Sequence, residues 1–405
     1  MYSLTKSLGG LSARFYAIST ASFLFQLPGF MAQPVIALYL IKLGASLPEV
    51  GLIISVQSML MIFLRIPLTL VTQRLGEERM IKLAFVVQAS AYVIYYLAPS
   101  PTWFFLIPFY QILATGSFNQ LALAGATNAA PRARQGDAIG QYMTFMHAGQ
   151  FIGPLITSVL VGYVGYSGIF LAAALAPAIG LALFLGAGFG AKMEKAAKEP
   201  KGVDGAPGVL ATLGLVLREK DVRLLAVVRV SYSLSSSMFT TLFPVWAVND
   251  LQLSSSVVAL LFSVIGFANT VIRIPVGKLA DRMGAKRVLF LTFLVIIVDY
   301  AVIAYSRNVY LLGLAILGYG ACSGIRAVAE WTHLVDVVQP KIKTLSMSFL
   351  FNCWDIGAML GSISAGLLTT FLPFQMILLL AAFINVPTVP AINAMKDVET
   401  EGGEE

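Results

Sequence analysis

The stretch RIPLTLVTQRLGEER (residues 65–79) decides the fold, because the chain repeats its pattern as RIPVGKLADRMGAKR (residues 273–287). The two copies lie 208 residues apart in a chain of 405. Each copy places Arg and Pro at the end of a long apolar run and then sets Arg, Gly and Arg in the same register. Two later glycines, Gly149 and Gly153, match Gly357 and Gly361 at the same offset. The chain is therefore predicted to contain two similar halves in parallel order.

The composition indicates a membrane protein. Hydrophobic residues make up 58% of the chain and charged residues 12%, with a mean hydropathy of +0.82. Soluble domains carry about 25% charged residues, and a soluble fold cannot hide this much apolar surface from water. The net charge of +7 is interpreted as the charge bias of a membrane protein rather than as a site for nucleic acid. The two cysteines, Cys322 and Cys353, offer neither a disulfide framework nor a metal cluster.

Apolar runs of membrane-spanning length recur along the chain. A bilayer core of about 30 Å needs roughly 20 apolar residues in a helix, and helix is favoured because lipid cannot satisfy an open backbone. The sequence predicts an all-α membrane protein with twelve transmembrane helices in two pseudo-symmetric bundles of six. The expected helices are 15–40, 48–72, 81–98, 103–125, 138–163, 166–191, 221–248, 256–280, 288–306, 309–334, 344–368 and 371–395.

Lysine and arginine predict the orientation. With the N-terminus inside, 21 of them fall on the inner side and two, Lys42 and Arg307, in outer loops. We therefore expect a multi-pass protein of the cytoplasmic (plasma) membrane, with both termini cytoplasmic. The predicted domains are a first bundle (1–191), a cytoplasmic linker (192–220), a second bundle (221–395) and an acidic disordered tail (396–405). The later part of the linker is either a helix on the membrane surface or a flexible segment.

The repeated stretch resembles motif A of the major facilitator superfamily of secondary transporters, and the likeness in span number and repeat covers the whole chain. The better copy is GKLADRMGAKR, and the first copy keeps fewer of the motif's residues. The resemblance implies that this loop latches the cytoplasmic side shut in one state of the transporter. The alternative is that the basic residues of this short loop only set the orientation of the protein in the membrane. The residues concerned are Gly277, Asp281, Arg282, Gly284, Lys286 and Arg287, with Arg74 and Gly76 in the first copy.

The fifth run resembles motif C, which the family associates with antiporters, drug efflux among them. Its spacing is carried by Gly140, Gly149, Gly153 and Pro154. Small residues four apart also serve plain helix packing, and a proline bends a helix by freeing a carbonyl. The arginine that drug–proton antiporters of the family carry in the fourth span is not evident. That span offers Asn119 and Gln120 instead.

Ionisable residues within the spans are the candidates for a substrate or ion pathway, because a charge in the bilayer is costly. Arg326, Glu330 and His333 form one stripe of the tenth run. The family's geometry implies that the cavity is faced by Arg326, Glu330, Arg229, His147 and Asp355. Glu330 or Asp355 is hypothesised to exchange a proton, with Arg326 tuning it or holding an anionic group.

Plainer readings stay open for several of these residues. Arg326 and Glu330 could form only an i,i+4 pair on one helix. His147 could be a hydrogen-bonded packing residue. Asp299, in the ninth run, is expected to be one member of a structural pair.

Enzymatic functions are not expected. The sequence lacks G-x4-G-K-[ST], so there is no phosphate-binding loop for an ATP-driven pump. The segment GYGACSG (318–324) lies inside an apolar run without a preceding strand and is interpreted as a packing surface. Two histidines and no paired cysteines predict no metal site, and no cofactor is expected.

The sequence thus predicts a secondary active transporter that works by alternating access. We expect efflux of lipophilic compounds or metabolites. The alternatives are uptake or exchange of a small polar or anionic solute, and a non-transporting receptor of the same fold. The expected partners are a small-molecule substrate, protons as a coupling ion and membrane lipid, with no nucleic acid. The protein is expected to be a monomer.

Overall fold

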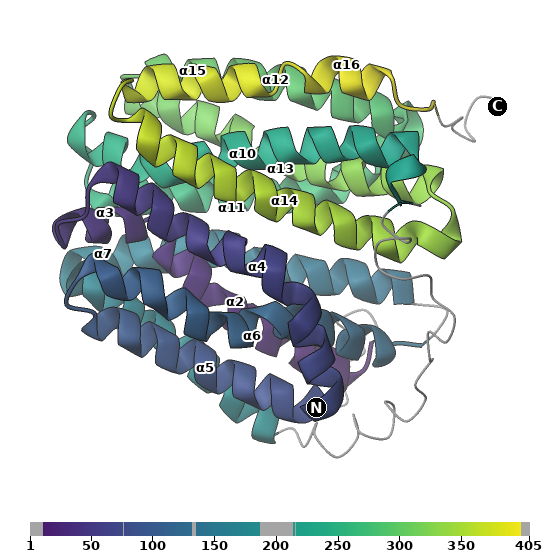
Figure 1. Cartoon of the computed structure of the whole chain (residues 1–405), viewed down its shortest axis with the longest axis horizontal. Helices are drawn as coiled ribbons and strands as arrows, with labels where there is room; N and C mark the ends of the chain where they lie inside the picture. Colours follow the sequence, from purple (N-terminus) through teal and green to yellow (C-terminus); the bar gives the residue numbers. More distant parts are fainter. Residues whose placement is uncertain (1–10, 76, 132–134, 187–213, 215, 398–405) are drawn as a thin grey trace. The chain divides into compact units, whose positions relative to one another are not determined.

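The computed structural model describes residues 11–75, 77–131, 135–186, 214 and 216–397, apart from some side chains within its helices. These residues are almost entirely helical and contain no strand (Figure 1). The helices are α2 (Ala13–Ala32), α3 (Ile36–Lys42), α4 (Leu47–Leu75), α5 (Glu77–Leu97), α6 (Pro101–Asn128), α7 (Gln135–Gly186), α10 (Lys220–Asn249), α11 (Ser255–Met283), α12 (Ala285–Tyr305), α13 (Val309–Val337), α14 (Pro340–Leu368), α15 (Phe374–Ile384) and α16 (Thr388–Asn393).

Within the described residues, helices are found in all twelve expected runs, but two of the runs are broken, and residues 187–191 of the sixth run lie outside the described residues. The first is split into α2 and α3, which are bent by 45°, and the last into α15 and α16. By length and hydropathy, seven of the described helices could each cross a membrane, or eight if the bent pair forms one span. The all-α membrane fold is confirmed, while the count of twelve spans is not fully established by this criterion.

The fifth and sixth runs join into the single helix α7, which contains one non-helical residue. Gly165 has φ +67° and ψ −178°, a conformation that is open essentially only to glycine. The break falls between the two expected runs, 138–163 and 166–191. Gly165 therefore lets the chain turn between the two helical parts of α7.

The helices group into two compact units. The first contains the described parts of residues 1–44, 63–201 and 254–263, and the second those of 45–62, 202–253 and 264–397. The start of α4 thus belongs to the second unit, and the start of α11 to the first. These groups do not coincide with the two sequence halves, so the expected division at the linker stays a prediction. Most of that linker and nearly all of the acidic tail lie outside the described residues.

An aromatic core holds the first unit together. The rings of Phe25 and Phe118 stack with centroids 3.7 Å apart, and Phe85 meets both edge-on. A short polar chain crosses this core, because Gln111 donates to Gln88, and Gln88 donates to the carbonyl of Phe25. These bonds satisfy buried amides between α2, α5 and α6.

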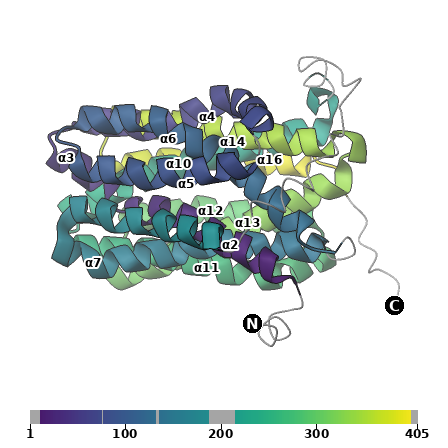
Figure 2. The ribbon, with the colours of Figure 1, turned by 90° about the horizontal axis from the view of Figure 1, so that it is seen from below.

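The second unit is built around α10, which lies beside α14 (Figures 1 and 2). Its core contains Tyr232, Phe239, Phe293 and Tyr300, all essentially without solvent exposure. Burying such rings removes much apolar surface from the solvent and rigidifies the helix contacts. The unit therefore offers a firm framework for the charged side chains that α10 and α13 carry.

In both units, paired glycines bring the first long helix against a later one. On α7, added Cβ atoms at Gly149 and Gly153 would lie 2.9 and 2.7 Å from atoms of Phe30 on α2. On α14, the matching Gly357 and Gly361 pack in the same way against α10. Small residues four apart let helix backbones approach closely in membrane proteins. The structure therefore gives these repeated glycines a common packing role.

Candidate functional site: a buried arginine pair in the second unit

Glu330 lies between two arginines in the second unit. Arg229 on α10 donates from Nη1 to Oε1 of Glu330 at 2.7 Å, and Arg326 on α13 donates from Nη1 to Oε2. The exposed fractions of the three residues are 0% for Glu330, 4% for Arg326 and 5% for Arg229. The i,i+4 pair that the sequence left open as an alternative is therefore present on α13, but Arg229 from α10 joins it.

Aromatic side chains surround the two guanidinium groups. Arg229 lies over the ring of Trp331 at 4.5 Å and near the ring of Phe351 at 5.6 Å. Arg326 lies over Tyr232 at 4.0 Å, and both arginines are within 5.6 Å of Trp354. Such contacts stabilise a desolvated cation through the quadrupole of the ring. They also give the cluster an aromatic wall made by α10, α13 and α14.

The three-residue cluster carries one net positive charge in a buried environment, since two guanidiniums share one carboxylate. The Nε atoms of Arg229 and Arg326 are buried and have no hydrogen-bond partner among the described residues. Leaving a buried donor unsatisfied costs about 1–3 kcal/mol, and an unbalanced buried charge costs more. An anion that met these atoms would remove both penalties.

A third arginine lies nearby on α11. Arg273 donates from Nε to Asn269 at 3.0 Å, and Asn269 donates to Ser323 on α13 at 3.0 Å. Arg273 is also close enough to Arg326 for electrostatic repulsion between the two. The positive character of this part of the second unit therefore extends beyond the central cluster.

His333 does not join Glu330, although the sequence places them on one stripe. Its Nε2 lies 3.8 Å from Oδ1 of Asp221 at the start of α10, and both residues are buried. Asp299, on α12, was expected to have a structural partner. It faces Gly318 on α13, and its Oδ2 has no hydrogen-bond partner among the described residues. That expected pair is not observed.

The other residues expected in the pathway lie on three different helices, α6, α7 and α14. Asp355 is half-buried on α14, next to Trp354 of the aromatic wall, and His147 is half-buried on α7 in the first unit. Asn119 lies on α6, where its buried Oδ1 has no hydrogen-bond partner among the described residues. Gln120 is on the same helix, and its side chain is not described.

Motif A is described in part. Gly284 has φ +83° and forms the N-cap of α12, so it turns the chain between α11 and α12. Lys286 donates to the carbonyl of Met395 at 2.8 Å, and Arg287 is exposed. The positions of Gly277, Asp281 and Arg282 fall within α11 and that of Arg74 within α4, but their side chains are not described, and Gly76 lies outside the described residues.

The motif C-like residues all lie on α7 and differ in their surroundings. Gly149 and Gly153 make the close approach to α2, and Pro154 is buried within the continuing helix. Gly140 has open space where a Cβ would stand. In the GYGACSG segment, Gly320 and Gly324 approach the backbone of α11 closely. The interpretation of that segment as a packing surface is confirmed.

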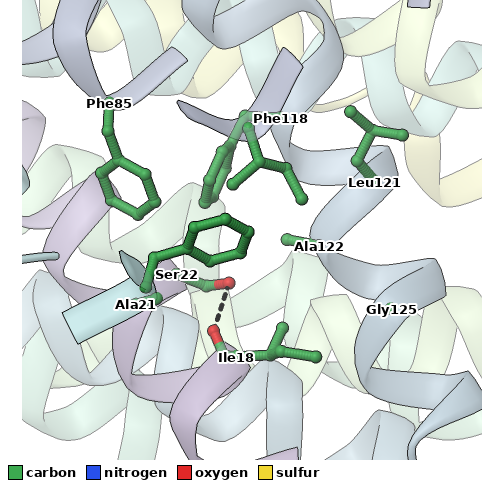
Figure 3. Close-up of a pocket in the computed structure, with 10 residues that line it drawn as sticks. Ile18, Ala21, Ser22, Phe85, Phe118, Leu121, Ala122 and Gly125 are labelled. Carbon is green, nitrogen blue, oxygen red and sulfur yellow. Dashed lines mark hydrogen bonds between the residues drawn. The ribbon is translucent and has the colours of Figure 1, made fainter. Parts of the chain in front are cut away.

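A small apolar pocket lies in the core of the first unit (Figure 3). Its cavity of about 10 Å³ is lined by side chains that include Phe85, Phe118 and Leu121. The hydroxyl of Ser22, its one polar lining side chain, donates to the carbonyl of Ile18 at 2.8 Å. A space of this size holds at most a single water molecule. We therefore treat it as a packing gap rather than a ligand site.

The described residues contain no group of three His, Cys, Asp or Glu side chains that could hold a metal ion. The two cysteines, Cys322 and Cys353, are buried and form no disulfide.

The model of the major facilitator superfamily matches the sequence over residues 18–325 and again over 225–395. The chain belongs to this family. Among solved structures, the nucleoside transporter NupG, in the form of a point mutant, superposes with a TM-score of 0.77 at 16% identity, covering 94% of this chain and 99% of that one. No curated protein is similar enough in sequence to be matched.

A second solved structure is a bacterial homologue of the human lysosomal transporter Spinster, in an inward-facing and occupied conformation. It has a TM-score of 0.76 at 14% identity, covering 94% of this chain and 95% of that one. Identities this low establish the fold alone. With the family established, this protein of the superfamily is a multi-pass membrane transporter rather than an enzyme.

The sequence places Arg326 and Glu330 on one helical stripe and makes Arg229 a separate candidate, but it does not predict that both arginines meet at one carboxylate. Arg229 and Glu330 are 101 residues apart, so no local pattern links them. The aromatic wall was missed altogether. Its only sequence signal is that Trp331 and Trp354 are immediate neighbours of the candidate residues Glu330 and Asp355.

Proposed function

We propose that this transporter carries a small organic anion with an aromatic or other apolar body. The observation that supports it is the pair of arginines on one buried carboxylate, with both Nε atoms unpartnered among the described residues. The anionic group of the substrate would meet the free guanidinium edges of Arg229 and Arg326. Its apolar body would lie against Trp331 and Phe351.

Charge balance favours an anion over a cation. The cluster of two guanidiniums and one carboxylate becomes neutral when one negative charge is added. A second cation at this place would raise the buried positive charge further, in surroundings of low dielectric constant where repulsion is strong. An anionic solute with an apolar body therefore fits the cluster best, and the apolar body agrees with the lipophilic substrate expected from the sequence.

Binding to the purified protein tests the proposal. Trp331 and Trp354 lie beside the arginines, so tryptophan fluorescence should report ligand binding there. Three probes share a phenyl ring: benzenesulfonate, phenyltrimethylammonium and benzyl alcohol. We expect saturable quenching by benzenesulfonate alone. Arg326→Gln should weaken binding by roughly 10- to 100-fold, because a hydrogen bond to a charged group contributes about 1.5–3 kcal/mol.

Arg307→Gln is the matched control for this experiment. Arg307 is an exposed arginine between α12 and α13, outside motif A, so the substitution removes the same charge without touching the cluster. Its affinity for benzenesulfonate should equal that of the wild type. Binding of phenyltrimethylammonium in place of benzenesulfonate would contradict the proposal.

Export is the direction we propose, and its support is the motif C-like spacing of Gly140, Gly149, Gly153 and Pro154. The close packing of Gly149 and Gly153 on α2 is not part of that support, because it recurs at Gly357 and Gly361. Expression in an efflux-deficient host tests it. Resistance to amphipathic anions would support export, whereas resistance to several unrelated cations would contradict the anion proposal.

Proton coupling through Glu330 or Asp355 is a further part of the proposal. Glu330 contacts both arginines directly, so a change in its charge would act on the proposed anion site. Flux of benzenesulfonate into proteoliposomes under an imposed pH gradient should lose its dependence on the gradient in Glu330→Gln or in Asp355→Asn. Unchanged gradient-driven flux in both variants would contradict proton coupling through either carboxylate.

A further inference from the structure

The last described residues of the chain are held against the second unit by polar contacts. We name residues 394–397, which follow α16, the C-terminal strap. Met395 in the strap is buried, with 3% of its surface exposed. Its carbonyl accepts a hydrogen bond from Lys286 Nζ at 2.8 Å, and the backbone N–H of Lys396 donates to Asp221 Oδ1 at 2.9 Å.

The two anchors belong to different helices. Asp221 is in the first turn of α10, and Lys286 is the second residue of α12. Lys286 also pairs with the carboxylate of Asp397 at 3.1 Å. The strap therefore connects the first turns of α10 and α12 at one end of the second unit. The sequence predicts that this end faces the cytoplasm.

The anchors differ in strength. Asp397 is 83% exposed, and exposed ion pairs contribute little. Asp221, by contrast, is 4% exposed, and burying a carboxylate is costly unless it is hydrogen-bonded. Its described contacts are the N–H of Lys396 and the imidazole of His333 at 3.8 Å. Departure of the strap would leave the Asp221 carboxylate without its backbone donor.

We propose that the C-terminal strap is a clasp, which holds the first turns of α10 and α12 together and must release before these helix ends can separate. α10 also carries Arg229, so any movement of α10 relative to α12 during transport would act on the strap through Asp221. The proposal concerns the second unit alone and stands whether or not the proposed substrate is correct.

Two measurements on the full-length protein test the clasp. Hydrogen exchange reports whether the strap is closed, since the amide of Lys396 is bonded to Asp221. Spin labels on cysteines introduced at Lys220 and Arg287, both exposed, report the distance between the two helix starts. The buried Cys322 and Cys353 are replaced by alanine in this background.

Lys286→Ala and Lys396→Ala make a matched pair of variants. Lys286 binds the strap through its side chain, whereas Lys396 contributes its backbone N–H and keeps an exposed side chain. In Lys286→Ala and in Asp221→Ala we expect exchange of the strap amides to rise by about tenfold. The spin-label distance should gain a second, longer population. Lys396→Ala should behave like the wild type in both measurements.

Two results would overturn the clasp. The first is strap amides that exchange in the wild type as fast as in Lys286→Ala, which would mean that the lysine anchors nothing. The second is faster exchange in Lys286→Ala with an unchanged distance distribution, which would mean that the strap does not hold α10 to α12. Asp221 is buried and its variant can fail to fold, so Lys286, whose side chain keeps 16% of its surface exposed, decides the question alone.

Discussion

Glu330 shows how a single residue sets the character of the candidate site. It is fully buried, and each of its carboxylate oxygens accepts a hydrogen bond from a different arginine. The carboxylate therefore bridges α10 and α13 while balancing one of the two positive charges. Removing one partner of a buried ionic group leaves the others uncompensated, which is far more costly than losing an exposed pair.

Glu330→Gln should accordingly lower the free energy of unfolding by about 3–5 kcal/mol, the range seen when one partner of a buried ion pair is removed. Thermal unfolding of the purified protein measures it. Benzenesulfonate should recover part of the loss, because it brings back a negative charge. The control is Glu78→Gln, which breaks an i,i+4 pair with Lys82 on α5 that is partly exposed. Equal effects of the two substitutions would argue against the buried cluster.

Gly165 is a second position where one residue decides the local structure. Its backbone conformation, φ +67° and ψ −178°, is disfavoured for any residue with a Cβ. Gly165→Ala should therefore destabilise the protein by about 1–3 kcal/mol. Gly162→Ala, three residues earlier in a helical conformation, is the control and should be near neutral. Thermal unfolding compares the two, and equal midpoints would mean that the turn in α7 does not require glycine.

At the scale of elements, the sequence predicted the helices well because membrane helices are long, apolar and ended by charge. The run expected at 309–334 is observed as Val309–Val337, and the one expected at 344–368 as Pro340–Leu368. The breaks in the first and last runs were not predicted. Pro34 and Pro387 lie at these breaks, but Pro67, Pro154 and Pro244 lie within continuous helices.

Proline alone therefore does not locate a break, because neighbouring helices can satisfy the carbonyl that it frees. The candidate site was less predictable still. Local spacing identified Arg326 and Glu330 as a pair on one helix. The contribution of Arg229 and of the aromatic wall depends on which faces of α10, α13 and α14 meet, and that is decided by packing between elements far apart in the chain.

The contact between α2 and α7 provides a prediction at this scale. A Cβ added at Gly153 would lie 2.7 Å from Phe30 Cβ, which is closer than two non-bonded carbon atoms approach. A Cβ added at Gly140 would meet open space. Both glycines are on α7. Gly153→Ala should destabilise the protein by about 1–3 kcal/mol through overpacking. Gly140→Ala should be neutral or slightly stabilising, since alanine is the better helix former. Thermal unfolding that ranks the two variants the other way would contradict the packing account.

At the scale of the whole molecule, family membership makes the protein a transporter, and the second unit supplies the most specific chemistry found in the described part of the chain. The proposed anion site requires two arginines from α10 and α13, and the proposed clasp links the starts of α10 and α12. Both proposals therefore involve α10, through Arg229 in the anion site and through Asp221 in the clasp. This is the helix that Gly357 and Gly361 of α14 approach most closely.

Entrance counterflow in proteoliposomes tests the central claim, that the arginine pair binds an organic anion which the protein then transports. Vesicles preloaded with benzenesulfonate are diluted into labelled benzenesulfonate, a permanent anion that crosses lipid poorly. Wild-type protein and Arg307→Gln should accumulate the label transiently, while Arg326→Gln and Arg229→Gln should not. Equal accumulation by Arg326→Gln and the wild type would contradict the account.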